Sequence, residues 1–148
     1  MKIVIAIGLI GLGLTGCASM KPATPLVTTA AVCQPQRFEV YFADSQAGLT
    51  RPAHQAIAMR ADRLKGCDIR SVKVMGLADA RGGAAANLSL SERRAQSVVE
   101  ALAATGWPAP VFEVEAVGDE GATTAAGVRE PLRRRTEVLV DAVAKPAS

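Results

Sequence analysis

The spacing of apolar residues switches between two periods along residues 38–141 of this 148-residue chain. Alternation of apolar and polar residues predicts strands with one buried face. It is clearest at 38–42 and 111–117, and we predict two further strands at 69–75 and 136–141. Helical spacing separates the first three of these segments. This order predicts the α/β (α+β) class, as a mixed βαβαββ sheet with the helices packed on one face. Right-handed crossovers would make the first strands parallel.

Both predicted helices carry start and stop signals. The first begins after Thr50 and ends at Gly66, as an N-cap hydroxyl and a terminal glycine indicate. The second begins near Ser89, which has the capping-box spacing to Glu92, with Ser91 as an alternative N-cap. Its single apolar stripe consists of Ala95, Val98, Val99, Leu102 and Ala103.

Composition excludes several classes of function. The chain is 49% hydrophobic and carries a net charge of only +3 with one Trp and one Tyr, so we expect one folded domain that does not bind nucleic acid. The single histidine, His54, leaves little room for zinc catalysis or a histidine-based triad. No nucleophile with a base, metal cluster or pair of catalytic carboxylates is visible, so we expect neither an enzyme nor a cofactor.

The first residues have the pattern of an export signal. Lys2 precedes an unbroken run of aliphatic residues and glycines at 3–14, which is shorter than the about 20 residues of a transmembrane helix. Its length suits a secretory signal instead. The run ends in a motif that resembles the lipobox of bacterial lipoproteins, Leu14-Thr15-Gly16-Cys17. We therefore predict a lipoprotein signal peptide at 1–16, the alternative being an ordinary signal peptide.

The lipobox resemblance implies that Cys17 becomes the first residue of the mature chain and carries acyl chains such as palmitate. Ala18 follows it, which by the usual sorting rule favours the outer membrane. Residues 17–35 would form the lipidated cysteine and a flexible tether, with the domain in the periplasm. Two further cysteines, Cys33 and Cys67, would reach an oxidising compartment, where we expect them to form a disulfide, the alternative being two buried thiols.

Charged residues of both signs follow the second predicted strand. Asp79 lies just after it, and Arg93 and Arg94 fall in the first turn of the predicted second helix. Cations there oppose the helix dipole. Strand ends are where open α/β sheets bind ligands. The residues alone leave two interpretations open, a salt bridge from Asp79 to Arg94 or a pocket for a zwitterion.

Residues 38–141 resemble the OmpA-like peptidoglycan-binding domain, which also occurs in Pal-type lipoproteins. Three signatures occur in the order expected for this family: Gly76-x-x-Asp79, then Asn87-x-x-Leu90-Ser91-x-x-Arg94-Ala95, then Arg134-Arg135-Thr136-Glu137. The resemblance implies an OmpA-like domain at 36–142, followed by a tail at 143–148.

The family's functional residues can be carried over by position. Asp79 and Arg94 would then bind the diaminopimelate of the peptidoglycan stem peptide. Asn87, Arg135 and Asp44 would form a secondary part of the pocket. Arg134 forms a pair with Arg135 that would line the pocket wall or support it.

The resemblance implies non-covalent binding of peptidoglycan and anchoring of the outer membrane to the cell wall. An alternative is a protein-interaction subunit of an envelope assembly (a motor, secretion or adhesion complex) that uses the same fold. Many family members have a histidine and a hydroxyl residue where this chain has Leu77 and Ala78. Fewer polar side chains there could weaken binding or shift it to backbone contacts.

Overall fold

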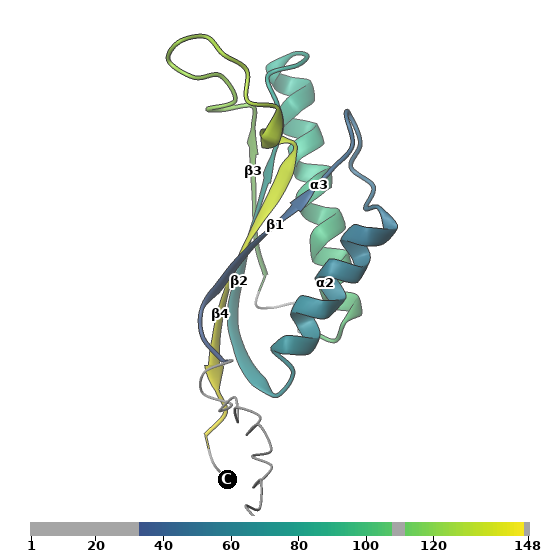
Figure 1. The fold of residues 1–148 in the computed structure, drawn as a ribbon, viewed down its shortest axis with the longest axis vertical. Helices are drawn as coiled ribbons and strands as arrows, with labels where there is room; N and C mark the ends of the chain where they lie inside the picture. Colours follow the sequence, from purple (N-terminus) through teal and green to yellow (C-terminus); the bar gives the residue numbers. More distant parts are fainter. Residues whose placement is uncertain (1–32, 108–111, 147–148) are drawn as a thin grey trace, which may run out of the picture.

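The computed structural model describes residues 33–107 and 112–146. The predicted signal peptide, the lipidation site Cys17 and most of the tether lie outside these residues. The described part forms a four-stranded sheet with two long helices on one face (Figure 1). The predicted fold class and the one-sided packing of the helices are confirmed. Neither helix in this part of the chain is long and apolar enough to cross a membrane.

The sheet has the strand order β1-β4-β2-β3. Strand β4 pairs antiparallel with both β1 and β2, whereas β2 and β3 pair in parallel. Strands β1 and β2 therefore run in the same direction, as predicted, but β4 lies between them. The strands comprise β1 (Gln36–Tyr41), β2 (Cys67–Leu77), β3 (Phe112–Gly118) and β4 (Arg135–Ala144).

The first helix, α2 (Arg51–Arg63), starts as predicted. The Thr50 hydroxyl accepts a hydrogen bond from the Ala53 N–H at 3.3 Å, and Pro52 occupies the first turn. This satisfies one backbone donor, and the missing proline N–H costs nothing there.

The second helix, α3 (Ala84–Ala104), starts earlier than predicted. Gly83 is its N-cap, so the capping box at Ser89 and the alternative at Ser91 are both wrong. The alanines at 84–86 join the helix because alanine has the highest helix propensity. Arg93 and Arg94 consequently lie in the third turn of α3 rather than in its first. The helix dipole acts mainly on the first turn, so these two cations do not oppose it as the sequence analysis supposed.

The core lies between the two helices and the sheet. The outer face of the sheet is polar, with ion pairs such as Lys73–Glu115 at 2.8 Å. His54 is exposed on α2, and Trp107 is buried after α3. The inward-facing side chains of the core include Phe38 and Val40 of β1, Val72 and Val74 of β2, Val138 and Val140 of β4, Ile57 of α2, and Val98 and Leu102 of α3.

Helix α3 lies directly on β2 at Gly76. An ideal Cβ atom on Gly76 would come within 1.9 Å of the Ser91 carbonyl oxygen and 3.2 Å of the Ala95 Cβ. Only glycine permits this contact between a strand backbone and a helix backbone. The absence of one side chain therefore sets how close α3 comes to the end of β2.

A Gly76→Ala substitution should lower the free energy of unfolding by about 3 kcal/mol or more, because neither backbone can move aside easily. Gly48→Ala is the matched control, since a Cβ atom added to Gly48 would have no other atom within 4 Å, and it should change stability by less than about 0.5 kcal/mol. Urea denaturation of both variants measures the difference. Equal effects would show that the close approach does not constrain the fold.

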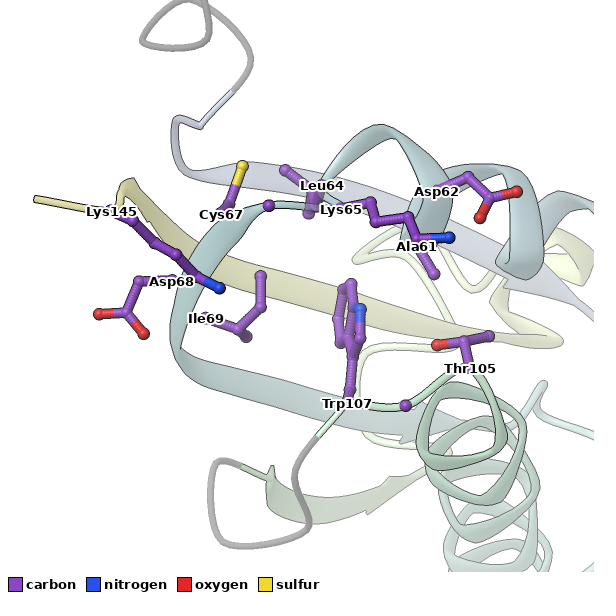
Figure 2. A pocket seen from close by; sticks show the side chains of 12 residues that line it. Ala61, Asp62, Leu64, Lys65, Cys67, Asp68, Ile69, Thr105, Trp107 and Lys145 are labelled. Atoms are coloured by element: carbon purple, nitrogen blue, oxygen red, sulfur yellow. The ribbon is translucent and has the colours of Figure 1, made fainter. Parts of the chain in front are cut away.

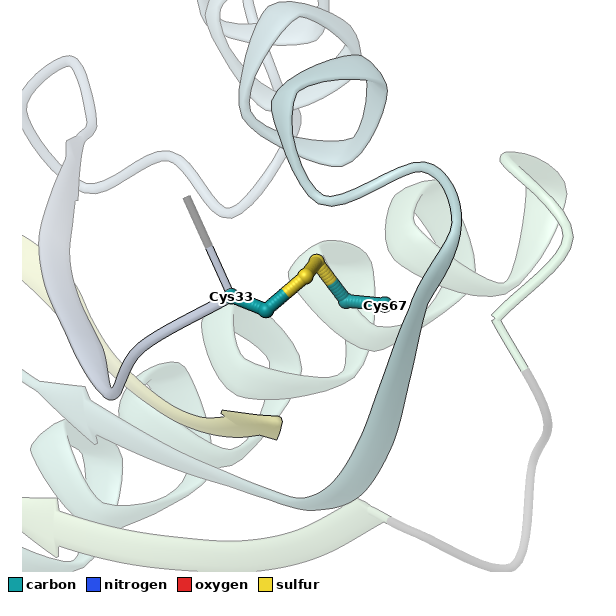
Figure 3. Close-up of a disulfide and its surroundings, with 2 residues drawn as sticks. All are labelled: Cys33 and Cys67. Carbon is teal, nitrogen blue, oxygen red and sulfur yellow. A yellow bond between two sulfur atoms is a disulfide. The ribbon is translucent and has the colours of Figure 1, made fainter. Parts of the chain in front are cut away.

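Cys33 and Cys67 form a disulfide, with their Cα atoms 5.5 Å apart (Figure 3). It joins the segment before β1 to the first residue of β2, so the predicted disulfide is confirmed and the alternative of two free thiols is wrong. The bond closes a loop with a sequence separation of 34 residues. Such a crosslink limits the conformations of the unfolded chain.

Reduction of this disulfide should lower the free energy of unfolding by about 3 to 4 kcal/mol on the chain-entropy estimate. Chemical denaturation with and without reductant measures the loss. The Cys33→Ala, Cys67→Ala double variant is the control, because reductant should not affect it. An unchanged midpoint after complete reduction of the wild-type chain would contradict the prediction.

Candidate functional site

Most of the charged residues that the sequence singled out, Asp44, Asp79, Arg94 and Arg134, gather where β2 ends and α3 begins. This end of the sheet is opposite the disulfide, because Cys67 is the first residue of β2 and Leu77 is its last. The loops after β1 and β3 meet it there (Figure 1). The backbone N–H of Ala78 donates to the Gly118 carbonyl at 2.7 Å, which holds the chain in place as it leaves β2.

Asp79 is 7% exposed and pairs with Arg134 rather than with Arg94. One carboxylate oxygen accepts from Arg134 Nη1 at 3.1 Å, and the other accepts from the Arg81 backbone N–H at 3.3 Å. The simple salt bridge between Asp79 and Arg94 considered from the sequence is therefore absent. Arg134 is the acidic residue's partner in this structure.

Arg94 is fully buried, and it has the largest side chain of the residues in that class. Its guanidinium donates to three backbone carbonyls: Leu77 at 2.9 Å, Gln46 at 2.8 Å and Ala43 at 3.4 Å. It also lies over the Phe42 ring, 5.1 Å from the centroid. These contacts replace the water that burial removes.

The surroundings of Arg94 shift its proton affinity in both directions. Burial is the largest influence and lowers the pKa of the guanidinium, while the nearby Asp79 carboxylate raises it. Arg134 lowers the pKa further and Asp44 raises it. The carboxylates Asp79 and Asp44 thus favour the charged form of Arg94 without touching it.

The buried side of α3 changes from apolar to polar toward this site. Its buried residues are, in chain order, Asn87, Ser91, Arg94, Ala95, Val98 and Leu102. All follow one helical stripe. Extending the apolar stripe backward by three and four residues would have selected Arg94 over the neighbouring Arg93. This signal was present in the sequence, but the predicted helix start hid it.

Ser91 and Asn87 connect α3 to the end of β3. The Ser91 hydroxyl donates to the Leu88 carbonyl at 2.8 Å and accepts from the Gly118 N–H at 3.0 Å. The Asn87 amide donates to the Asp119 carboxylate at 2.9 Å. Asn87 thus helps to hold the loop after β3 through Asp119. The sequence analysis did not identify Asp119 as a residue of this site.

Asp44 lies beside the site and pairs with Arg81 at 2.9 Å. Arg135, in contrast, does not join the cluster, because its guanidinium pairs with Glu137 at 2.6 Å and Glu39 at 3.4 Å. Successive strand residues point to opposite faces, and Arg135 shares the outer face of the sheet with these carboxylates. The structure therefore places Arg135 apart from this cluster, whereas Arg134 belongs to it through its ion pair with Asp79.

Asp79 faces a small cavity of about 150 Å³ that Ala80, Arg81, Arg129 and Pro131 also line. Leu77 and Ala78 do not line it, because both side chains are buried. The backbone of these two residues contacts Arg94 and Gly118 instead. The two apolar residues noted in the sequence therefore form no part of the cavity wall.

A second cavity lies at the opposite end of the domain. It measures about 350 Å³, and Figure 2 shows Trp107, Lys65 and Lys145 around it, near Cys67. It contains none of the residues that the sequence singled out for ligand binding. Within residues 33–107 and 112–146, no group of three or more His, Cys, Asp or Glu side chains is arranged to hold a metal ion.

Replacing Arg94 by methionine should lower the free energy of unfolding by about 2 to 4 kcal/mol, because three buried carbonyls lose their donor. Arg93→Met is the matched control. The Arg93 side chain is exposed and donates to the Ser89 hydroxyl on its own helix, so its loss should cost less than about 0.5 kcal/mol. Thermal unfolding of both variants compares them, and similar melting temperatures would contradict a structural role for Arg94.

Comparison with known proteins agrees with this architecture. The sequence profile of the OmpA family matches residues 41–135. The outer-membrane lipoprotein YfiB of Pseudomonas aeruginosa is 33% identical over 121 residues, which cover 72% of each chain. The chain spans about a third of the length of the outer membrane protein A relatives that it also matches, 36% and 37%.

Two solved structures extend the comparison. The OmpA-like domain of FopA1 from Francisella tularensis is 26% identical with a TM-score of 0.63, and the match covers 77% of each chain. The cell wall anchor of the T6SS from Pseudomonas aeruginosa is 27% identical with a TM-score of 0.59, over 75% of this chain and 82% of that one. The profile match, the sequence identity and the shared fold together show that this chain belongs to the OmpA family.

Proposed function

We propose that this end of the domain binds peptidoglycan non-covalently by holding the diaminopimelate of the stem peptide. The free end of diaminopimelate carries an ammonium and a carboxylate on one carbon atom. A site for it needs opposite charges held on rigid elements. The observation that supports the proposal most is the placement of Asp79, at the end of β2, beside a small cavity that two arginines also line.

Asp79 is suited to bind the ammonium group. Its carboxylate is nearly buried and is held by a backbone N–H, so its position does not depend on a mobile side chain alone. Arg134 occupies one of its oxygens in this structure. The ammonium group of the ligand would bind the Asp79 carboxylate beside Arg134 or in its place. The carboxylate would then have a cationic partner both before and after the ligand binds.

Arg94 retains the capacity to bind a carboxylate. A guanidinium has five N–H groups, and three of those of Arg94 bond to carbonyls, which leaves two without a partner among the described residues. Because the side chain is fully buried, a ligand reaches it only if a covering segment moves. The turn that supplies the Ala43 and Gln46 carbonyls is the segment we assign to this movement.

This turn contains a backbone conformation of raised energy. Ser45 has a φ of +55° and is the only non-glycine residue with positive φ in the described part of the chain. Such a conformation is disfavoured for residues with a Cβ atom. Opening the turn would relieve it, and the two remaining N–H groups of Arg94 would become available to the carboxylate.

The proposal extends to the whole chain through its N-terminal residues. Acylation of Cys17 would hold the chain in the outer membrane, and the domain would hold the cell wall. The disulfide end carries the connection to the N-terminal residues, while Asp79 lies at the other end of β2. This arrangement suits a link between a membrane on one side and a polymer on the other.

Calorimetry of the full-length protein in detergent tests the proposal with two muropeptides that differ in one residue. One carries diaminopimelate, and the other carries lysine, which lacks the terminal carboxylate. We expect heat from the first ligand and at least about tenfold weaker binding of the second, because a charge-assisted pair is lost. Equal binding of the two muropeptides would contradict recognition of the zwitterion.

Asp79→Asn should weaken binding of the diaminopimelate muropeptide by about tenfold or more, since the amide has no charge to offer the ammonium. Asp68→Asn, an exposed carboxylate at the disulfide end, is the matched control and should bind like the wild type. Circular dichroism establishes that both variants are folded. Wild-type affinity in Asp79→Asn would contradict the proposal that Asp79 binds the ammonium group.

A further inference from the structure

Strand β1 leaves one edge of the sheet open. It is the outermost strand and pairs only with β4 among the described residues. The Phe42 N–H, directly after β1, donates to the Arg134 carbonyl on the β4 side at 2.9 Å. Backbone groups alternate sides along an antiparallel strand, so the N–H and C=O groups of Arg37, Glu39 and Tyr41 point away from the sheet.

A long groove runs along this open edge. It has a volume of about 480 Å³, and five consecutive β1 residues, 37–41, form one side of it. Ala56, Ile57 and Arg60 of α2 form the other side. A groove with a free strand edge on one wall and a helix on the other has the form of a site where an extended peptide adds to a sheet.

The helix wall of this groove is cationic. The Arg60 guanidinium lies over the Phe38 ring, 5.8 Å from its centroid, and forms no ion pair with the described residues. Arg63 follows three residues later, so it lies on the same side of α2. An occupant with carboxylates facing α2 would complement this wall.

We propose that the β1–α2 groove binds an extended, acidic segment of a partner protein, which pairs with β1 as an additional strand. Backbone hydrogen bonds to Arg37, Glu39 and Tyr41 would supply affinity, and the carboxylates opposite Arg60 would supply selectivity. The surface is separate from the Asp79 site, so one molecule can engage the cell wall and this partner together.

Charge argues against the two other occupants of the same groove. If a second copy paired through its own β1, the two-fold axis of the dimer would pass near the middle of the strand, where Arg60 lies over Phe38. The two Arg60 side chains would then repel each other. The N-terminal residues 18–32 contain Lys21 and two prolines but no Asp or Glu. Because proline has no backbone N–H to donate to a neighbouring strand, and because this segment has no carboxylate to face Arg60, residues 18–32 do not suit the groove.

Nuclear magnetic resonance of the full-length protein in detergent tests the proposal with two ten-residue probes, alternating valine–glutamate and alternating valine–lysine peptides. The acidic peptide should shift the amide signals of Arg37, Glu39 and Tyr41, and the basic peptide should not. Arg60→Gln should weaken the acidic peptide about tenfold. Arg93→Gln, an exposed arginine on α3, should leave its affinity unchanged.

A backbone substitution separates strand addition from simple charge attraction. Glu39→Pro removes an outward N–H that β4 does not use, and it should abolish the shifts, whereas Glu39→Gln removes the same charge but keeps the N–H and should retain them. Binding that persists in folded Glu39→Pro, equal binding of both peptides or no shift at millimolar acidic peptide would each overturn the proposal. Concentration-dependent shifts without peptide would identify a second copy as the occupant and overturn it too.

Discussion

The fold around the candidate site depends on the enclosure of one charged side chain, Arg94. A guanidinium without water is costly unless its N–H groups find acceptors. Here the acceptors are carbonyls of the loop after β1 and of the last residue of β2. One side chain of α3 therefore holds together three segments that are distant in the sequence, and the loop after β1 has its position because Arg94 needs its carbonyls.

This enclosure is possible only because α3 comes so close to the sheet. The missing side chain of Gly76 lets the Ser91 carbonyl approach the strand backbone, and the next helical turn then brings Arg94 level with the end of β2. Asp79 follows three residues after Gly76, two residues beyond the end of β2. The guanidinium is thus positioned by a helix, which holds a charged group more accurately than a loop does, while the Ala78–Gly118 hydrogen bond fixes the chain just before Asp79.

Hydrophobic periodicity was sufficient to predict most of the fold. The alternating segments became strands, and Thr50 capped the first helix as expected. The start of α3 was wrong because a local capping signal at Ser89 competed with the high helix propensity of the preceding alanines. That error also gave Arg93 and Arg94 the same environment, although one is exposed and the other is fully buried.

The sequence by itself determined the class of the fold, the residue types at the site and their membership of one neighbourhood, because periodicity and family spacing are local properties of the chain. Only the tertiary structure decided which charges meet. Asp79 pairs with Arg134 rather than Arg94, and Arg135 pairs with Glu137 on the outer face of the sheet. Such partners depend on strand order and on the direction of each side chain, which are established only when β4 inserts between β1 and β2.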